Sequence, residues 1–211
     1  METTNYLLKR AAAGDADASF RLGYRLAFGR NNPKPIPWTK VVAHWRAAAV
    51  QGHFRAMFYL GTCYDYGRGV PKAVDQAFAC YKQAAEAGEL AAAYNVAFCL
   101  LHGEGVAPDS KAAVAWLLYA AKRGDESAQR DLGYSYLMGH GVAEDHHQAV
   151  YWYRKAARQG DTKAQFNLGL CYVAGEGVPT STRWARYWLQ KAAGHRHRGA
   201  RAELRKLQGQ S

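Results

Sequence analysis

Four glycine-rich segments are the first residues of this sequence that could take part in chemistry. Each has the form Gly-x-Gly-Val, at 67–70, 103–106, 139–142 and 175–178, and closely spaced glycines are used by many proteins to bind phosphate groups. Here each segment follows a helical pattern instead of a strand, and none continues into Gly-Lys-Ser or Gly-Lys-Thr. The four segments are therefore interpreted as turns between helices.

Two groups of histidines have the residue type of a metal site. His146 and His147 are adjacent, and His195 and His197 flank Arg196. Neither group has a second ligand pair at helical or cysteine spacing, and the arginines around His195 and His197 oppose a cation. No Ser, His and acid grouping stands out, although stacked units could bring one together across the sequence. The sequence predicts a protein without enzymatic activity, catalytic residues, metal or cofactor.

These segments belong to a longer repeat of 36 residues, marked by glycines at 52, 88, 124 and 160. A fixed period of this length predicts stacked structural units, each too small to bury its apolar face alone. The other recurring positions are an alanine column (Ala56, Ala92, Ala128, Ala164), an aliphatic column (Leu60, Val96, Leu132, Leu168), a small-residue column (Gly61, Ala97, Gly133, Gly169) and a tryptophan-rich column (Cys80, Trp116, Trp152, Trp188).

Each unit is predicted to form two helices. The first runs over about 53–66, because apolar residues recur every fourth position there, and Gly67 supplies the left-handed residue that ends it. The second begins after Asp109, Asp145 or Ser181, whose side chains can accept hydrogen bonds from the first turn, and ends at the recurring glycine.

The repeat resembles a known family. Residues 164–178 read Ala-Gln-Phe-Asn-Leu-Gly-x-x-Tyr-x-x-Gly-x-Gly-Val, and residues 185–193 read Ala-x-x-Trp-x-x-Lys-Ala-Ala. This pattern is similar to the Sel-like (Sel-one) repeat, a relative of the tetratricopeptide repeat, and it covers about 15–193. The resemblance implies an all-α fold: a right-handed α-solenoid of about five antiparallel helix pairs with capping helices at both ends.

The predicted organisation is a single repeat domain over 1–211. The first repeat is irregular, because it has two extra residues and a connector with three prolines between 33 and 37. The segments are an N-terminal capping helix at 1–14, repeats at 15–52, 53–88, 89–124, 125–160 and 161–194, and a basic C-terminal cap at 195–211.

The cysteines favour a reduced protein. Cys63, Cys99 and Cys171 share one repeat column, and equivalent positions on successive helices lie roughly 8–10 Å apart, beyond the reach of a disulfide. A bridge between Cys63 and Cys80 across one helical hairpin stays geometrically conceivable. Reduced, buried cysteines are the favoured interpretation.

The resemblance implies where a partner would bind. In tetratricopeptide-like stacks the first helix of each pair lines a concave face, so a mainly apolar and aromatic groove is expected there. Residues of the Phe58 column could instead pack between repeats, which leaves both readings open at Phe58, Tyr94 and Phe166. The predicted groove residues are Tyr24, Phe28, Phe58, Tyr66, Tyr94, Phe98, His102, Arg130, Tyr134, Met138, Phe166 and Leu170.

Positive charge gathers at the C-terminal end. The chain has a net charge of +11, and residues 179–211 hold eight cations against one acidic residue. Such an end could bind nucleic acid or an acidic protein surface, or it could only keep the cap soluble. The basic-cap residues are Arg183, Arg186, Arg196, Arg198, Arg201, Arg205 and Lys206.

These patterns predict a cytoplasmic, non-enzymatic adaptor that binds a protein segment in the groove. No apolar stretch is long enough to cross a membrane, and the N-terminal residues lack the apolar core of a secretory signal. The expected partner is a protein with an apolar or amphipathic segment and an acidic surface. Bacterial proteins of similar sequence include scaffolds, regulators and toxin-immunity proteins. The alternative is binding of nucleic acid, or of an acidic surface, through the basic cap.

Overall fold

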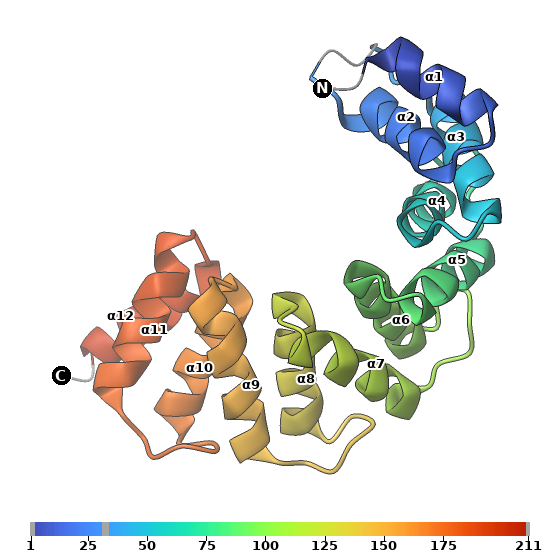
Figure 1. Ribbon diagram of the computed structural model, residues 1–211. Helices are drawn as coiled ribbons and strands as arrows, with labels where there is room; N and C mark the ends of the chain where they lie inside the picture. The colour runs from blue at the N-terminus through green and yellow to red at the C-terminus, as the bar shows by residue number, and fades with distance from the viewer. Residues whose placement is uncertain (1–2, 31–33, 210–211) are drawn as a thin grey trace. The chain divides into compact units, whose positions relative to one another are not determined.

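The computed structural model describes residues 3–30 and 34–209, and in these ranges the chain forms twelve α-helices joined by short connections (Figure 1). The all-α repeat fold expected from the sequence is confirmed. The helices are α1 (Thr4–Ala12), α2 (Ala16–Phe28), α3 (Trp38–Val50), α4 (Phe54–Tyr66), α5 (Val74–Glu86), α6 (Leu90–His102), α7 (Ser110–Lys122), α8 (Glu126–Met138), α9 (His146–Gln159), α10 (Thr162–Ala174), α11 (Thr182–Gly194) and α12 (Arg198–Gly209).

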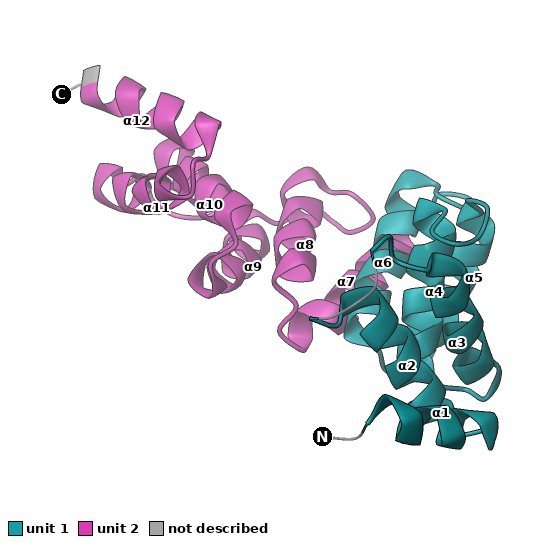
Figure 2. Cartoon of the chain, turned by 90° about the horizontal axis from the view of Figure 1, so that it is seen from above, with its two compact units in different colours: residues 1–108 teal, residues 109–211 magenta. Residues whose placement is uncertain are grey.

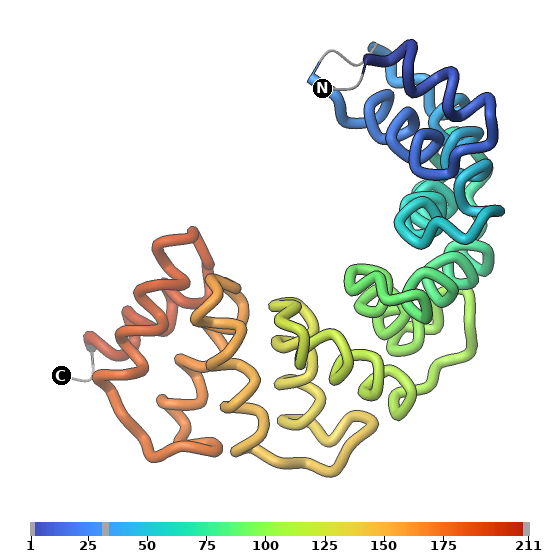
Figure 3. Tube along the Cα trace, in the orientation of Figure 1, coloured from blue at the N-terminus to red at the C-terminus, as the bar shows by residue number. Residues whose placement is uncertain are grey.

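The chain divides into two compact units, residues 1–108 with α1–α6 and residues 109–211 with α7–α12 (Figure 2). Within each unit, helices that follow one another in the chain pack together, and the Cα trace in Figure 3 shows the resulting hairpins. The first helices of the pairs are α2, α4 and α6 in unit 1 and α8 and α10 in unit 2. A single domain over all 211 residues stays a prediction.

The helix boundaries follow from local capping chemistry. Asp109, Asp145 and Ser181 each accept a hydrogen bond from the backbone N–H three residues later, at 3.0, 2.9 and 3.3 Å. These bonds satisfy donors that the first turn of a helix leaves unpaired. Gly67 ends α4 in the left-handed conformation, with φ of 65°. The predicted starts of the second helices and the predicted end of the first helix are therefore confirmed.

Glycine in the small-residue column allows the two helices of a pair to touch. A Cβ added at Gly61 would come within 2.8 Å of the Tyr81 ring, and one added at Gly133 would come within 2.7 Å of the Tyr153 ring. Both distances are shorter than carbon atoms tolerate, so the aromatic ring of the second helix occupies the space that a side chain would need. Burial of such rings and of the alanine columns forms the core of each unit.

The terminal helices cover the ends of the two units. Leu7 of α1 is buried against Ala18 and Leu22 of α2. Ala200 of α12 is buried against Leu189 and Ala192 of α11. The predicted capping segments are thus helical, while residues 31–33 of the proline-containing connector lie outside the described residues.

Candidate functional site

The candidate site is the exposed face of the first helices. Among the described residues, fourteen large apolar side chains are exposed, and six of them occupy only two columns of the repeat. One column holds Tyr24, Phe98 and Tyr134, and the other holds Phe28, Tyr66 and Met138. We name these six residues the aromatic strips, one strip in each unit. Exposed apolar surface that gathers in this way usually marks a binding site.

In unit 1 the exposed rings of Tyr24 and Phe28 rest on the half-buried ring of Tyr59. The Tyr24 ring centroid lies 5.1 Å from that of Phe28, and both rings contact Tyr59 of α4, at 5.7 and 5.8 Å. Tyr59 stacks in turn on the buried Trp45, with 5.0 Å between centroids. Because these contacts restrict the exposed rings, a partner would lose little side-chain entropy on binding to them.

Tyr59 is a residue of this cluster that sequence reasoning missed. Its equivalents in the following repeats are Asn95, Asp131 and Asn167. A single ring in an otherwise polar column is the signal that could have identified it.

Tyr66, the last residue of α4, is 66% exposed, and the remaining strip residues lie on α6 and α8. Phe98 is 38% exposed, and its ring lies 4.3 Å from that of His102. Tyr134 is 47% exposed and contacts the His140 ring edge-on at 5.8 Å, while Met138 is also exposed. Leu170, the equivalent of Tyr134 on α10, is half-buried.

The Phe58 column connects one repeat to the next. Phe20 is buried and its ring stacks on His53 at 4.5 Å. Phe166 contacts His197 in the equivalent way at 4.4 Å. Both histidines also cap the helix that they begin, since Nδ1 accepts the backbone N–H of Ala56 or Ala200 at 3.2 Å. These aromatic rings therefore stabilise the repeat stack, and the half-buried Phe58 and Tyr94 of the same column leave little surface for a partner.

Arg130 belongs to this column and forms intrachain ion pairs. Its guanidinium donates to Asp161 at 2.8 Å and to Asp131 at 2.7 Å. The Arg130 and Asp161 side chains are only 15% and 10% exposed. Asp161 is also the cap of α10, accepting the backbone N–H of Ala164 at 2.6 Å. Arg130 thus joins α8 to the start of α10.

Several of the basic-cap residues also have intrachain partners. Arg186 donates to the backbone carbonyl of Leu207 at 2.9 Å, which joins α11 to the end of α12. Lys206 pairs with Glu203 at 2.7 Å. Arg183, Arg196 and Arg198 are exposed, as are Arg201 and Arg205. The cap therefore combines structural cations with a set of cations that face solvent.

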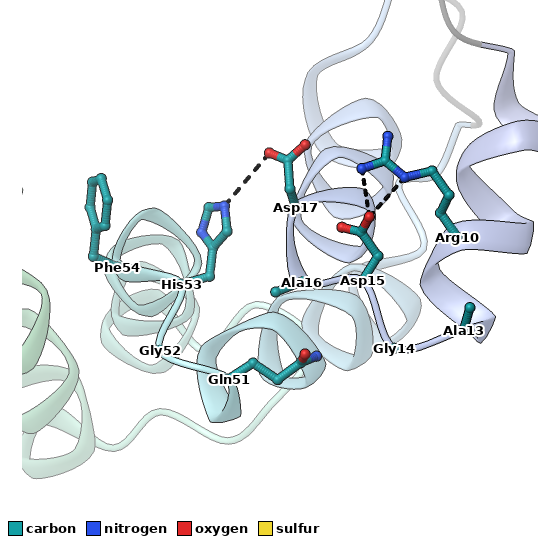
Figure 4. Close-up of a pocket in the computed structure, with 10 residues that line it drawn as sticks. All are labelled: Arg10, Ala13, Gly14, Asp15, Ala16, Asp17, Gln51, Gly52, His53 and Phe54. Carbon is teal, nitrogen blue, oxygen red and sulfur yellow. Dashed lines mark hydrogen bonds and ion pairs between the residues drawn. The ribbon is translucent and has the colours of Figure 1, made fainter.

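A hollow of about 690 Å³ opens between the turns at the start of α2 and α4 (Figure 4). Its polar groups are used to stabilise those turns. Asp15 accepts the backbone N–H of Ala18 at 2.9 Å and the Arg10 guanidinium at 2.7 Å. The Ala18 hydrogen bond and then Arg10 hold the pKa of Asp15 below its ordinary value. Asp17 faces His53 at 3.9 Å.

The cysteines are poor nucleophiles in this fold. All four are free, with Cys63, Cys99 and Cys171 buried and Cys80 half-buried. Burial raises the pKa of each thiol to about 11, so little reactive thiolate exists near neutral pH. Within 3–30 and 34–209, no group of three or more His, Cys, Asp or Glu side chains is arranged to hold a metal ion.

The helical pairs and their 36-residue period define an α-solenoid repeat protein. The Sel1 repeat model matches residues 16–35, 54–89, 90–125, 126–161 and 162–196. The chain therefore belongs to the Sel1 repeat family, whose members generally mediate protein–protein interactions. No curated protein matches the sequence. Over the part of the chain that the structure describes, no helix has both the length and the apolar character needed to cross a membrane.

Two solved structures share both sequence and fold with this chain. One is c5321, a protective antigen of uropathogenic Escherichia coli, with 35% identity and a TM-score of 0.87 over 92% of this chain and 41% of that one. The other is a Sel1 repeat protein of Oxalobacter formigenes, with 35% identity and a TM-score of 0.83 over 97% and 59%. This chain therefore spans about two fifths and three fifths of their lengths.

A third structure shows the fold alone. The immunity protein PA5088 of Pseudomonas aeruginosa is 23% identical, with a TM-score of 0.51 over 88% of this chain and 66% of that one.

Proposed function

We propose that this chain is a non-enzymatic adaptor that binds another protein through the aromatic strip of each unit. The observation that carries the proposal is the gathering of Tyr24, Phe28, Tyr66 and Phe98 in unit 1, and of Tyr134 and Met138 in unit 2, in two exposed repeat columns. Membership of a family of interaction proteins supports it. An apolar or amphipathic segment fits these rings best, because it would bury them together with its own apolar side chains.

The surrounding chemistry supports binding without catalysis. The buried thiols are held as un-ionised groups by their raised pKa values. Apart from the hydroxyls of Tyr24, Tyr66 and Tyr134, the six strip residues carry no ionisable side chain. The four free cysteines support a reducing compartment, such as the cytoplasm, as part of this proposal.

Site-specific photo-crosslinking tests the proposal. A benzophenone amino acid at position 98 or 134 is expected to capture the same polypeptide from an extract of the native organism. Phe54 is a matched control, because it is an exposed aromatic residue of a first helix that lies outside the two columns. Phe98→Ala and Tyr134→Ala should each weaken binding of the captured protein by roughly tenfold or more, as for aromatic hot spots. Equal capture from position 54, or binding unchanged by both substitutions, would refute the assignment.

One specific form of this role is neutralisation of a toxin. An immunity protein binds its toxin tightly and needs no activity of its own, which suits a rigid repeat surface. A toxin encoded beside this gene, inactivated by the purified chain and not by the Phe98→Ala, Tyr134→Ala double variant, would support this form. A neighbouring toxin that stays fully active with an excess of the chain would exclude it.

The second candidate function is binding of nucleic acid through the basic cap. It is favoured by the solvent-facing arginines of α12, which has one acidic residue, Glu203. Binding of this kind falls steeply with salt, because cations at the phosphates displace counterions. Gel shifts with DNA and RNA at about 50 and 200 mM salt, with an Arg198→Gln, Arg201→Gln, Arg205→Gln variant, test it. Absence of a salt-sensitive shift dismisses this candidate.

A further inference from the structure

The second helices α9 and α11 carry exposed rings that the repeat does not require. Tyr151 and Tyr187 occupy equivalent positions and are 45% and 42% exposed. The earlier second helices have alanine at this position, namely Ala43, Ala79 and Ala115. The fold therefore accepts alanine there, and the neighbouring Trp152 and Trp188 supply the buried rings. We name Tyr151, Lys155, Arg183, Trp184, Tyr187 and Lys191 the α9–α11 face.

A cation accompanies each exposed ring of this face. The Lys155 ammonium lies 4.8 Å from the Tyr151 ring centroid, and Lys191 lies 5.4 Å from that of Tyr187. Arg183 lies 6.0 Å from the ring of Trp184, which is 46% exposed. Lysines 155 and 191 are equivalent in the repeat, where earlier second helices have Ala47, Gln83 and Tyr119. Tyrosine and lysine thus recur together on two successive second helices.

Negative charge is absent from these two helices. Neither α9 nor α11 contains Asp or Glu, whereas together they hold six Lys and Arg residues. Three acidic residues that flank these helices in the chain have other contacts: Asp145 caps α9, Asp161 pairs with Arg130, and Glu144 lies 3.0 Å from His146. The positive field of the face is therefore not cancelled locally, which attracts an anionic partner and repels a basic one.

Contacts through α10 hold the two helices in register. Arg154 of α9 donates to the Tyr172 hydroxyl at 3.3 Å, and the Tyr172 ring stacks on Trp184 at 6.3 Å. His147 at the start of α9 lies 3.0 Å from the carbonyl oxygen of Gly177, in the turn before α11. A hollow of about 610 Å³ runs along α11 beside Arg183, Trp184 and Tyr187. The rings and cations are thus presented by one connected part of unit 2.

We propose that the α9–α11 face binds an acidic polypeptide segment that also carries apolar side chains. Carboxylates would pair with Lys155, Lys191 and Arg183, while the apolar side chains pack against the edges of Tyr151, Trp184 and Tyr187. The position of the cations favours a polypeptide over single-stranded nucleic acid. A base stacks on an open ring face, but here a cation of the same helix lies over each ring, whereas carboxylates reach these cations without displacing them.

This surface shares no residue with the aromatic strips, and it shares only Arg183 with the basic-cap residues. The strips lie on the first helices, and the solvent-facing cap arginines Arg198, Arg201 and Arg205 lie on α12. A separate set of variants therefore tests each surface. If the test of the α9–α11 face fails, the aromatic strips remain a candidate binding site. If the test of the strips fails, the α9–α11 face remains one.

The experiment uses a fluorescein-labelled 12-residue peptide of alternating Glu and Leu, measured by fluorescence polarisation with the full chain. A Gln and Leu peptide of the same length and a dT12 oligonucleotide are the comparison probes. The Glu and Leu peptide is expected to bind, and to bind more weakly at 200 than at 50 mM salt. Tyr151→Ala with Tyr187→Ala should reduce its affinity about tenfold, as should Lys155→Gln with Lys191→Gln.

Matched control variants show whether peptide binding depends on the residues of this face or on any exposed ring or cation of the protein. Alanine is native at the position of Tyr151 and Tyr187 in three other repeats, so that pair of substitutions should leave the fold intact, which the melting temperature verifies. Phe54→Ala removes an exposed ring of a first helix outside the aromatic strips, and Lys163→Gln removes an exposed cation of α10. Both variants should bind the peptide as the parent does.

Four results would overturn the proposal. They are no binding of the Glu and Leu peptide at millimolar concentration, equal binding of the Gln and Leu peptide, equal loss in the control variants, and tighter binding of dT12 that depends on the same tyrosines. The last result would assign the face to nucleic acid.

Discussion

A pair of glycine substitutions in one turn tests how the repeats fit together. Gly139 and Gly141 both have positive φ, 66° and 74°. A Cβ at Gly139 would meet no atom outside its neighbouring residues closer than 3.6 Å, whereas one at Gly141 would overlap the backbone carbonyl of Ser110. Ser110 is the first residue of α7, so Gly141 is where the turn after α8 touches the preceding second helix.

The two variants should differ in stability because only one has a steric conflict. Alanine in the left-handed region costs about 1–2 kcal/mol, offset by about 0.4–1 kcal/mol from the stiffer unfolded chain. Gly139→Ala should therefore lower the free energy of unfolding by about 1 kcal/mol. Gly141→Ala adds an overlap with backbone that no rotamer relieves, and overpacking costs a further ~1–3 kcal/mol. The free energy of unfolding of Gly141→Ala is expected to fall by about 2–4 kcal/mol in total.

Thermal and urea unfolding measure this difference. For a chain of this size, 1 kcal/mol corresponds to roughly 2–4 °C in melting temperature, so Gly141→Ala should melt about 4–16 °C lower. Circular dichroism and tryptophan fluorescence should be recorded together, because a repeat protein can unfold in parts. Gly124→Ala, with φ of 101° and no atom within 4 Å, is the control without a contact. Equal losses for Gly139→Ala and Gly141→Ala would show that the close contact with Ser110 does not exist.

Three further predictions concern buried and capping groups. Thiol labelling with a disulfide reagent at pH 8 should be slow for all four cysteines and fast in 8 M urea, because folding raises each thiol pKa to about 11; rapid labelling of the native protein would contradict the burial. Gln129→Leu should lower the free energy of unfolding in urea by about 1–3 kcal/mol, because the buried Gln129 amide donates to the Ala121 carbonyl at 3.0 Å and accepts from Gln159 at 2.8 Å. An unchanged free energy of unfolding would show that these hydrogen bonds do not stabilise the protein. Asp15→Asn should lower the melting temperature near neutral pH, because a pKa of Asp15 that is lowered on folding stabilises the folded state above the unfolded pKa of about 4. The difference from the parent should shrink as pH falls through the lower folded pKa, and a difference that stays constant as pH falls below about 4 would contradict this linkage.

The parts of the fold that were predictable from sequence are those set by local chemistry. Asp145 begins α9 because a carboxylate accepts hydrogen bonds that the first turn cannot make internally. Gly67 ends α4 because the left-handed conformation is open to glycine. The repeat's small-residue column marked Gly133 as a position of close helix contact, and a Cβ there would meet the Tyr153 ring. These signals need only the residue, its neighbours in the chain and the 36-residue period.

The candidate site was less predictable because exposure depends on residues from other helices. Sequence reasoning gave Arg130 and Tyr134 the same status in the groove, but the acidic residues that pair with Arg130 come from α8 and from the cap of α10. Tyr59 escaped notice because its contribution lies in contacts with Tyr24 and Phe28 of the preceding first helix. The recurrence of Tyr151 and Tyr187 was visible in the repeat alignment, yet only the structure places a cation over each ring.

Three residues of the Phe58 column contact the residue that caps the helix two further along the chain, and these contacts separate packing from binding. A phenylalanine is matched with a histidine at Phe20 and His53 and again at Phe166 and His197. Where the column holds Arg130, the matching cap is Asp161.

The strip columns show no such matching, since Tyr24, Phe98 and Tyr134 remain exposed whatever lies in the next repeat. The rings of Phe20 and Phe166 have a structural role, because they contact the cap of another helix in the stack. No such cap contact accounts for the exposed rings of the strips. Because exposed rings favour aggregation and add little to stability, the exposed rings at these unmatched positions support the proposal of a partner that covers them.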